Sequence, residues 1–182
     1  TGSTGANSLS GAAGNDTLDG GTGIDTMAGG DGSDGYYVRD SGDIVSETNA
    51  TTSTGGTDIV YSTLAAYTLT TNVENGRILS TTAANLTGNT LNNVLYAGAG
   101  NNVLNGGTGT DSDTVSYVYG LAGTTGVTVS LAVSSAQATG GSGSDTLLSI
   151  ENLIGSAYAD RLTGNTGANS LSGAAGNDTL DG

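Results

Sequence analysis

Aspartates in glycine-rich loops are the residues of this sequence whose type and spacing could support chemistry. Residues 20–28, 29–37 and 140–148 fit the pattern G-G-x-G-x-D-x-U-x, where U is a large apolar residue. Residues 11–19 and 173–181 keep its first and fourth glycines, its aspartate and its apolar position. Within each run the carboxylate recurs every nine residues, so a regular fold of the repeat would bring carboxylates together in rows.

The spacing of these aspartates predicts a column of carboxylates. If a tight loop and a short strand make up each unit of nine, two units form one coil, and residues 18 apart lie on neighbouring coils about 4.8 Å apart. Two carboxylates at that distance repel by about 3 to 4 kcal/mol at an effective dielectric near 20, so the column requires a cation. The expected pairs are Asn7 with Asp25, Asp25 with Asp43, Asp16 with Asp34, Asn93 with Asp111, and Asp160 with Asp178.

Calcium is the cation that suits these ligands best. It accepts about six to eight oxygens in a flexible geometry, and glycine-rich loops offer carbonyl oxygens beside each aspartate. Magnesium demands a stricter octahedron, and zinc and copper prefer ligands that this chain lacks. We expect several Ca²⁺ ions. The expected carboxylate ligands are Asp16, Asp25, Asp34, Asp43, Asp111, Asp145, Asp160 and Asp178. Weaker amide ligands are expected at Asn7, Asn93, Asn102 and Asn169. The loop glycines are Gly11, Gly14, Gly20, Gly23, Gly29, Gly32, Gly106, Gly109, Gly140, Gly143, Gly173 and Gly176.

The composition excludes most other chemistry. With no His, Cys or Lys, the 182 residues cannot form a Ser-His-Asp triad, a thiol nucleophile, a Schiff base or a His/Cys zinc site, so we expect no enzyme. The net charge of −14 repels nucleic acids and anionic lipids. No apolar run approaches the roughly 20 residues that span a membrane, so neither nucleic acid binding nor membrane insertion is expected. High charge and low apolar content also predict a chain that is disordered without calcium.

The apolar positions divide the chain into blocks. They keep a nine-residue register within three groups: Leu9, Leu18, Met27, Tyr36 and Val45; Leu86, Leu95 and Leu104; Leu153, Leu162, Leu171 and Leu180. We therefore predict nonapeptide blocks at 1–46, 86–113 and 140–182. Degenerate strands and a loop are expected at 47–85, and further strands and a loop at 114–139, with protruding loops at 47–56 and 119–126.

A longer repeat contains these blocks. Residues 1–20 recur at 163–182 with a single difference, Ser3 against Asn165. The offset is 162 residues, so we expect 163–182 to begin the next unit of a tandem array. The expected partners are neighbouring units joined end to end, with self-association through the ends of the fold.

The sequence resembles the repeats-in-toxin (RTX) family of hemolysin-type calcium-binding proteins. Its nonapeptides carry the resemblance, and linking segments such as 36–47, 55–62, 71–75 and 149–165 are similar to those of large secreted members. The resemblance implies an all-β fold, a right-handed parallel β-roll with insertions in the middle. It also implies Ca²⁺ between successive turns, export by a type I system, an extracellular or cell-surface location, and folding only outside the cell.

The expected function is a calcium-dependent structural unit of an exported surface, adhesin or matrix protein. The alternative is a secretion and folding appendage of a type I-secreted hydrolase. A minor alternative is an ice- or carbohydrate-binding solenoid, in which tyrosines would stack on sugars. Tyr158 replaces the fourth glycine of its loop and Gly76 replaces an apolar residue, so those turns depart from the repeat, and residues 60–90 are expected to be largely metal-free.

Overall fold

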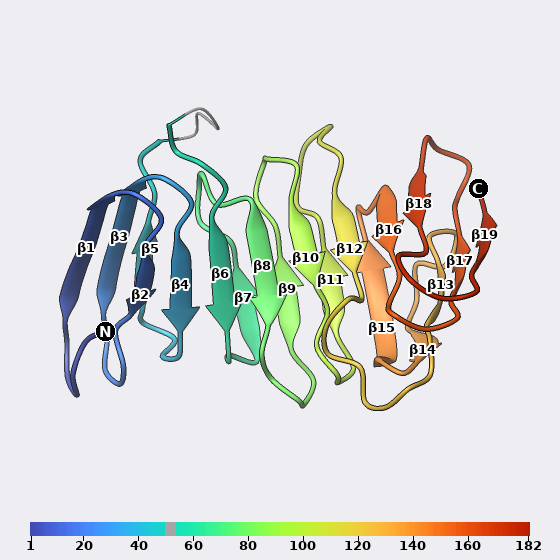
Figure 1. Ribbon diagram of the computed structural model, residues 1–182, viewed down its shortest axis with the longest axis horizontal. Helices are drawn as coiled ribbons and strands as arrows, with labels where there is room; N and C mark the ends of the chain where they lie inside the picture. The colour runs from blue at the N-terminus through green and yellow to red at the C-terminus, as the bar shows by residue number, and fades with distance from the viewer. Residues whose placement is uncertain (50–53) are drawn as a thin grey trace.

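Short strands alternate between two faces of an elongated solenoid in this computed structural model, which describes residues 1–49 and 54–182 (Figure 1). The described residues contain no helix. The termini lie at opposite ends of the long axis, and the chain winds through about nine turns between them. The prediction of an all-β parallel solenoid is confirmed.

One face is a single parallel sheet of eight strands. In spatial order its strands are β2 (Thr17–Asp19), β4 (Gly35–Val38), β6 (Ile59–Ser62), β8 (Asn75–Ile78), β10 (Val94–Tyr96), β12 (Thr114–Ser116), β16 (Asn152–Ile154) and β18 (Ser170–Ser172). Because the strands are so short, most of them direct only one or two residues into the interior, and stacking of the coils buries these residues.

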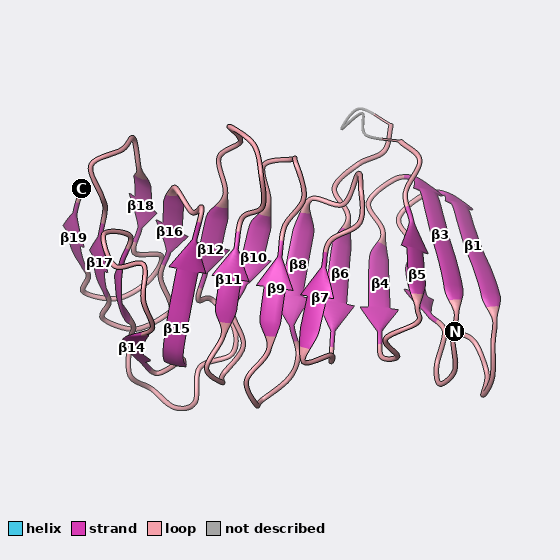
Figure 2. Ribbon diagram, turned by 180° about the vertical axis from the view of Figure 1, so that it is seen from behind, coloured by secondary structure: helices cyan, strands magenta, loops and turns pink. Residues whose placement is uncertain are grey.

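The opposite face is divided into three sheets (Figure 2). The first contains β1 (Ser8–Ala13), β3 (Thr26–Asp31) and β5 (Ile44–Ser46). The second contains β7 (Ala66–Thr68), β9 (Asn85–Thr87), β11 (Val103–Asn105), β15 (Gly143–Leu148) and β14 (Gln137–Gly140). The third contains β13 (Thr128–Ser130), β17 (Arg161–Thr163) and β19 (Thr179–Asp181).

The predicted 18-residue coil is found wherever the nonapeptides are regular. Leu9 pairs with Met27, and Leu18 pairs with Tyr36, each 18 residues later. The apolar position of the repeat forms the core, which includes Leu18, Met27, Tyr36, Val60, Leu86, Leu95, Leu104, Val115, Leu153 and Leu162. At the C-terminal end Leu180 is 47% exposed, so the last coil leaves apolar surface uncovered.

The middle of the solenoid departs from this register. Tyr36 pairs with Val60, 24 residues on, so the coil containing residues 47–58 is six residues longer than the regular coil. Residues 50–53 of the predicted loop 47–56 lie outside the described residues. The predicted loop at 119–126 contains no strand. Gly76 fills its inward position without a side chain because Leu69 and Leu86 occupy the space next to it.

The segment GGSGSD at 140–145 forms a hairpin, and the prediction of a regular nonapeptide loop there is wrong. β14 runs antiparallel to β15, with Gly140 opposite Gly143. Both glycines flank the two-residue turn at 141–142 and have a positive φ, 74° and 85°, which glycine adopts without steric cost. β15 pairs with β11, and a bridge between Val127 and Gly140 connects the hairpin to the coil of β13. The hairpin is therefore inserted into the face of the solenoid rather than projecting from it.

Candidate metal centre

Backbone hydrogen bonds join the sixth positions of successive loops into columns. In each step the N–H of one residue donates to a side-chain oxygen of the residue one coil later. Four of the five predicted pairs are confirmed: Asn7 to Asp25 at 2.8 Å, Asp25 to Asp43 at 3.1 Å, Asp16 to Asp34 at 2.8 Å and Asp160 to Asp178 at 2.9 Å. These hydrogen bonds hold the side chains of each column in register from one coil to the next.

The fifth pair was assigned to the wrong aspartate. The N–H of Asn93 donates to Oδ1 of Asp113, not of Asp111, at 2.8 Å. The reason is a coil longer by two residues, since Leu95 pairs with Val115, 20 residues later. Asp113 is consequently buried at the sixth position, whereas Asp111 precedes it in the loop with its Oδ2 buried and unpartnered among the described residues.

The same column continues through segments that lack the nonapeptide pattern. Asp34 N–H donates to Asp58 at 2.7 Å, Asp58 N–H to Glu74 at 2.8 Å, and Asp113 N–H to Glu151 at 2.9 Å. The two glutamates were not predicted from the sequence. Each glutamate stands two residues before an inward-facing position, as the loop aspartates do. The same spacing is visible in the sequence, in Val-Glu-Asn-Gly and Ile-Glu-Asn-Leu, and could have identified both glutamates.

The first regular loops keep one carboxylate oxygen free, and we call them open loops. Oδ2 of Asp16, Asp25 and Asp34 is buried and has no hydrogen-bond partner in the described part of the chain. The first glycine of each loop makes room for this oxygen, since an added Cβ at Gly11, Gly20 or Gly29 would collide with it. An uncompensated carboxylate oxygen that is buried against backbone costs free energy, so these atoms require a ligand.

The second residue of an open loop adopts a left-handed backbone conformation. Ala12, Gly21 and Gly30 have φ values of 76°, 93° and 107°. Glycine adopts this conformation without steric cost, and alanine does so under strain. The loop ending at Asp178 shares the backbone conformation of the open loops, because Ala174 has a φ of 64° and Gly173 leaves room for Oδ2 of the aspartate, but this oxygen is not buried as those of Asp16, Asp25 and Asp34 are. The fourth-position glycines also have positive φ values: Gly14, Gly23, Gly32 and Gly176.

Other loops satisfy their own sixth residue, and we call them closed loops. The N–H of the residue four positions earlier donates to the side-chain oxygen, and none of these donors has a positive φ. The bonds run from Ser3 to Asn7 (2.6 Å), Arg39 to Asp43 (3.0 Å), Asn89 to Asn93 (2.7 Å), Ser156 to Asp160 (2.6 Å) and Asn165 to Asn169 (2.7 Å). In a closed loop, a backbone N–H therefore donates to the side-chain oxygen of the sixth residue, whereas in an open loop the corresponding oxygen has no hydrogen-bond donor.

The hairpin satisfies Asp145 in another way. Its Oδ1 accepts a hydrogen bond from Asn102 N–H at 2.8 Å, and its Oδ2 accepts one from the Thr139 hydroxyl at 3.1 Å. Burial raises the pKa of Asp145 to about 6. Asn102 donates from its side-chain nitrogen to the carbonyl of Ala84 at 3.1 Å, while its own Oδ1 has no partner among the described residues. Both oxygens of Asp145 are therefore engaged without a cation.

Burial and mutual repulsion raise the pKa values of several column carboxyls. Burial is the main cause in each case: it raises the pKa of Asp34, and that of Asp58 and Asp113 to about 6. The pKa of Glu47 rises to about 7 because of burial and then repulsion from Asp58. No arginine relieves this charge, since the ion pair of Arg39 is with Asp19, at 2.7 Å.

The open loops fit calcium. The loops of Asp16, Asp25 and Asp34 combine a hard, unpartnered carboxylate oxygen with nearby backbone carbonyls, such as Gly29 O beside Gly11. Asp16, Asp25, Asp34 and Asp178 would hold the ions, and calcium would supply the positive charge that the columns lack. The geometry gives less support for the predicted ligands in closed loops and in the hairpin, because protein donors already occupy their oxygens.

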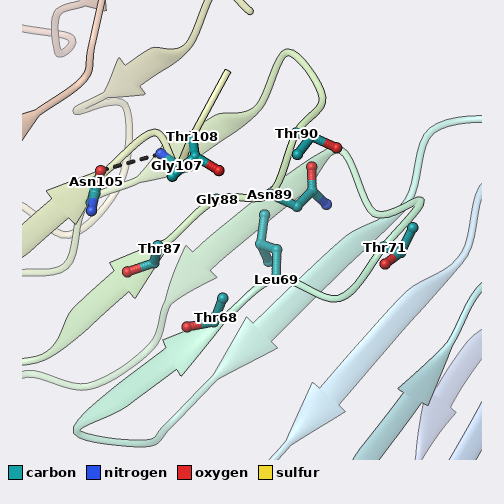
Figure 3. Close-up of a pocket in the computed structure, with 10 residues that line it drawn as sticks. All are labelled: Thr68, Leu69, Thr71, Thr87, Gly88, Asn89, Thr90, Asn105, Gly107 and Thr108. Carbon is teal, nitrogen blue, oxygen red and sulfur yellow. Dashed lines mark hydrogen bonds between the residues drawn. The ribbon is translucent and has the colours of Figure 1, made fainter.

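An open pocket of about 330 Å³ lies beside the C-terminal ends of β7, β9 and β11. Figure 3 shows Thr68, Thr87 and Asn89 at its wall, with Gly107 N–H donating to Asn105 Oδ1 at 3.2 Å. No carboxylate lines this pocket, and Asn89 belongs to a closed loop. The pocket therefore adds no metal site.

Comparisons with known proteins agree with this geometry. The sequence profile of the RTX calcium-binding nonapeptide repeat (4 copies) matches residues 1–36, 85–112 and 151–182, together more than half of the chain. No curated protein matches the sequence. Among the described residues, no helix has the length and apolar character needed to cross a membrane. The repeats of this family bind calcium, and the family is typical of exported proteins. The chain belongs to the RTX calcium-binding nonapeptide repeat family.

Proposed function

We propose that this chain is a structural unit that calcium folds outside the cell, within a large exported tandem-repeat protein of the surface, adhesin or matrix type. One observation carries the proposal: the buried, unpartnered Oδ2 atoms of Asp16, Asp25 and Asp34. Folding without an ion would leave these charges uncompensated. Calcium binds the folded chain alone, because only the folded chain brings carboxylate and carbonyl oxygens together, so its binding free energy is added to stability.

The near-identical recurrence of residues 1–20 at 163–182 supports the tandem arrangement. Leu9 of β1 and Leu171 of β18 occupy the same place in the two copies, and both pack against the core, although β1 lies on the divided face and β18 in the eight-stranded sheet. A following coil would cover the exposed Leu180. Extracellular calcium modules have dissociation constants of about 10⁻⁴ to 10⁻³ M, which would keep the unit unfolded inside a cell and folded outside it.

The tyrosines give no support to the alternative of a sugar-binding face. Tyr37 stacks on Tyr61 with ring centroids 4.9 Å apart, and the guanidinium of Arg77 lies 3.7 Å from the centroid of the Tyr119 ring. These rings therefore pack on one another and on an arginine along the outside of the eight-stranded sheet. A structural role on an elongated solenoid accounts for them without a ligand.

The proposal is tested by titrating the metal-free chain with Ca²⁺ and following β structure by circular dichroism. We expect a coil spectrum in excess chelator and a cooperative gain of β structure in the millimolar range of calcium. Magnesium at the same concentration serves as the control for ionic strength and should not replace calcium. A β spectrum that chelation leaves unchanged would show that the protein folds without calcium, and the proposal would be wrong.

A further inference from the structure

Three buried carboxylates converge where the first nonapeptide block meets the lengthened coil. Ligand atoms of Asp34, Glu47 and Asp58 all lie within 4.8 Å of one another. The three residues are 1%, 7% and 1% exposed. Glu47 and Asp58 lie outside the residues that the family profile matches, and the nonapeptide pattern has no carboxylate at the position of Glu47.

The register of the strands explains how these residues meet. Ala28 pairs with Ser46, so Glu47 stands one coil beyond Gly29, at the first position of the loop. Gly35 pairs with Ile59, so Asp58 stands one coil beyond Asp34, at the sixth position. The lengthened coil thus has a carboxylate at both positions, whereas a regular loop has one carboxylate and a glycine.

Two oxygens in this cluster have no partner within the described residues. They are Oδ2 of Asp34 and Oε2 of Glu47, and both are buried. The other oxygens hold the side chains in place: Asp34 Oδ1 accepts a bond from Asp16 N–H at 2.8 Å, and the hydroxyl of Tyr36 donates to Glu47 Oε1. A Cβ at Gly29 would collide with oxygens of Asp34, Glu47 and Tyr36, so the glycine preserves the space in which they converge.

The protein provides no positive charge for this cluster. Its cationic side chains are three arginines: Arg39 pairs with Asp19, Arg77 lies over Tyr119, and Arg161 belongs to β17 near the other end of the solenoid. Three buried carboxylates that converge need a positive charge, and no side chain of the protein provides it. Carboxylate oxygens are the ligands that a hard divalent ion prefers.

We propose that Asp34, Glu47 and Asp58 together bind one Ca²⁺ ion, at a three-carboxylate site that the nonapeptide pattern does not encode. Calcium affinity rises with the charge and the rigidity of the ligands, so this site binds its ion more tightly than the single-carboxylate open loops. The choice of calcium rests on the proposed function, whereas the convergence of the carboxylates does not. Because the ion joins Asp34 to both ends of the lengthened coil, it closes this coil onto the first block.

The test compares Glu47→Gln with Glu151→Gln in the full chain. The first change removes one charge and one oxygen from the cluster while keeping the size of the side chain. The second makes the same chemical change at a residue whose Oε2 accepts a bond from Asp113 N–H, outside the cluster. Calcium bound per chain is counted by equilibrium dialysis, and the steps of binding are resolved by calorimetry.

We expect Glu47→Gln to lose the tightest step of binding, because Asp34 is then left as a single-carboxylate open loop, while Glu151→Gln keeps that step. An equal first step in Glu47→Gln and the native chain would overturn the site. That result is distinct from failure of the proposed function, in which calcium would not induce β structure in the native chain at all.

A second measurement decides the case in which Glu47→Gln does not fold. Terbium replaces calcium, and its emission is excited through tyrosine, since the hydroxyl of Tyr36 touches Glu47. Emission from the first equivalent of terbium should be lost in Tyr36→Phe and retained in Tyr158→Phe. Retention of the full emission in Tyr36→Phe would place the first ion elsewhere and overturn the proposal.

Discussion

Acidification should stabilise the calcium-free fold. Burial raises the pKa of Glu47 from 4.5 to about 7, and that of Asp58, Asp113 and Asp145 from 3.8 to about 6. At a pH between the unfolded and the folded pKa of a group, the folded chain keeps that group protonated, whereas the unfolded chain releases the proton. The stability contributed by these groups is therefore fully present below about pH 4 and is lost as the pH rises to about 7.

Asp145 gives the magnitude most directly. It is fully buried and lies apart from the three-carboxylate cluster. A pKa that rises from 3.8 to about 6 corresponds to about 3 kcal/mol of stability gained on acidification. That is a large part of the 5–15 kcal/mol typical of a whole domain. Asp19 acts in the opposite direction, since its hydrogen bond with Arg39 lowers its pKa, so its contribution is lost in acid and the optimum lies near pH 4.

The assay follows β structure by circular dichroism in the presence of chelator as the pH is lowered from about 7.5 to about 4, and urea unfolding then measures stability at the pH values where the calcium-free chain folds. Asp145→Asn should remove about 3 kcal/mol of the pH dependence. The reasoning would be refuted by a calcium-free stability that is flat or rises over this range. It would equally be refuted by a chain that has no β structure at pH 4, because protons would then not replace calcium.

Further outcomes test the loops, the core and the array. Asp16→Ala should raise the calcium midpoint of folding more than Asn7→Ala, because it removes an unpartnered charged oxygen; equal shifts would contradict the distinction between open and closed loops. Ala12→Gly should stabilise the calcium-loaded fold by about 1 kcal/mol, measured by urea unfolding, because it relieves a φ of 76°, and a loss of stability would count against this. Leu95→Ala should cost about 2 to 5 kcal/mol and Leu180→Ala much less, because only Leu95 is buried; similar costs would show that the core is not where we place it. X-ray scattering of two joined units with calcium should show one continuous rod, and two bodies on a tether would argue against end-to-end stacking.

Regular parts of the fold could be predicted because the nonapeptide encodes them locally. A tight loop and a three-residue strand repeat the same backbone conformation, so Asp16 reaches Asp34 and Leu18 reaches Tyr36 without further information. The pairing of Asn93 was missed because it depends on the number of residues between strands. Two extra residues move the sixth position from Asp111 to Asp113, and the loop sequence GGTGTD is unaffected by them.

Other errors came from segments whose partner lies far away in the sequence. The letters GGSGSD match the repeat, yet residues 137–140 compete for the same segment by antiparallel pairing, and the hairpin results. The sequence of its own coil does not mark Glu47 as a ligand, because Glu47 meets other carboxylates only through its contacts with Gly29 and Asp34, one coil earlier. Periodicity predicts neighbours at fixed offsets, and it fails where insertions change the offset.

The distribution of the two loop classes suggests how calcium acts along an array. Open loops lie at residues 11–34, and the loop at 173–178 shares their backbone conformation. Closed loops lie near the ends, at Asn7 and Asn169, and further in, at Asn93 and Asp160. The one difference between the recurring segments, Ser3 against Asn165, falls on the donor of a closed loop. The backbone N–H of either residue makes the same bond to the sixth position, while the side chains differ in their partners: Ser3 Oγ accepts from Asn7 Nδ2 at 3.4 Å, and Asn165 Oδ1 accepts from Gly167 N–H at 2.8 Å. If units stack in register, the open loops of one end adjoin those of the next unit. Calcium bound by these loops would then stabilise the junction between units, in addition to the ion proposed at Asp34, Glu47 and Asp58 within the unit.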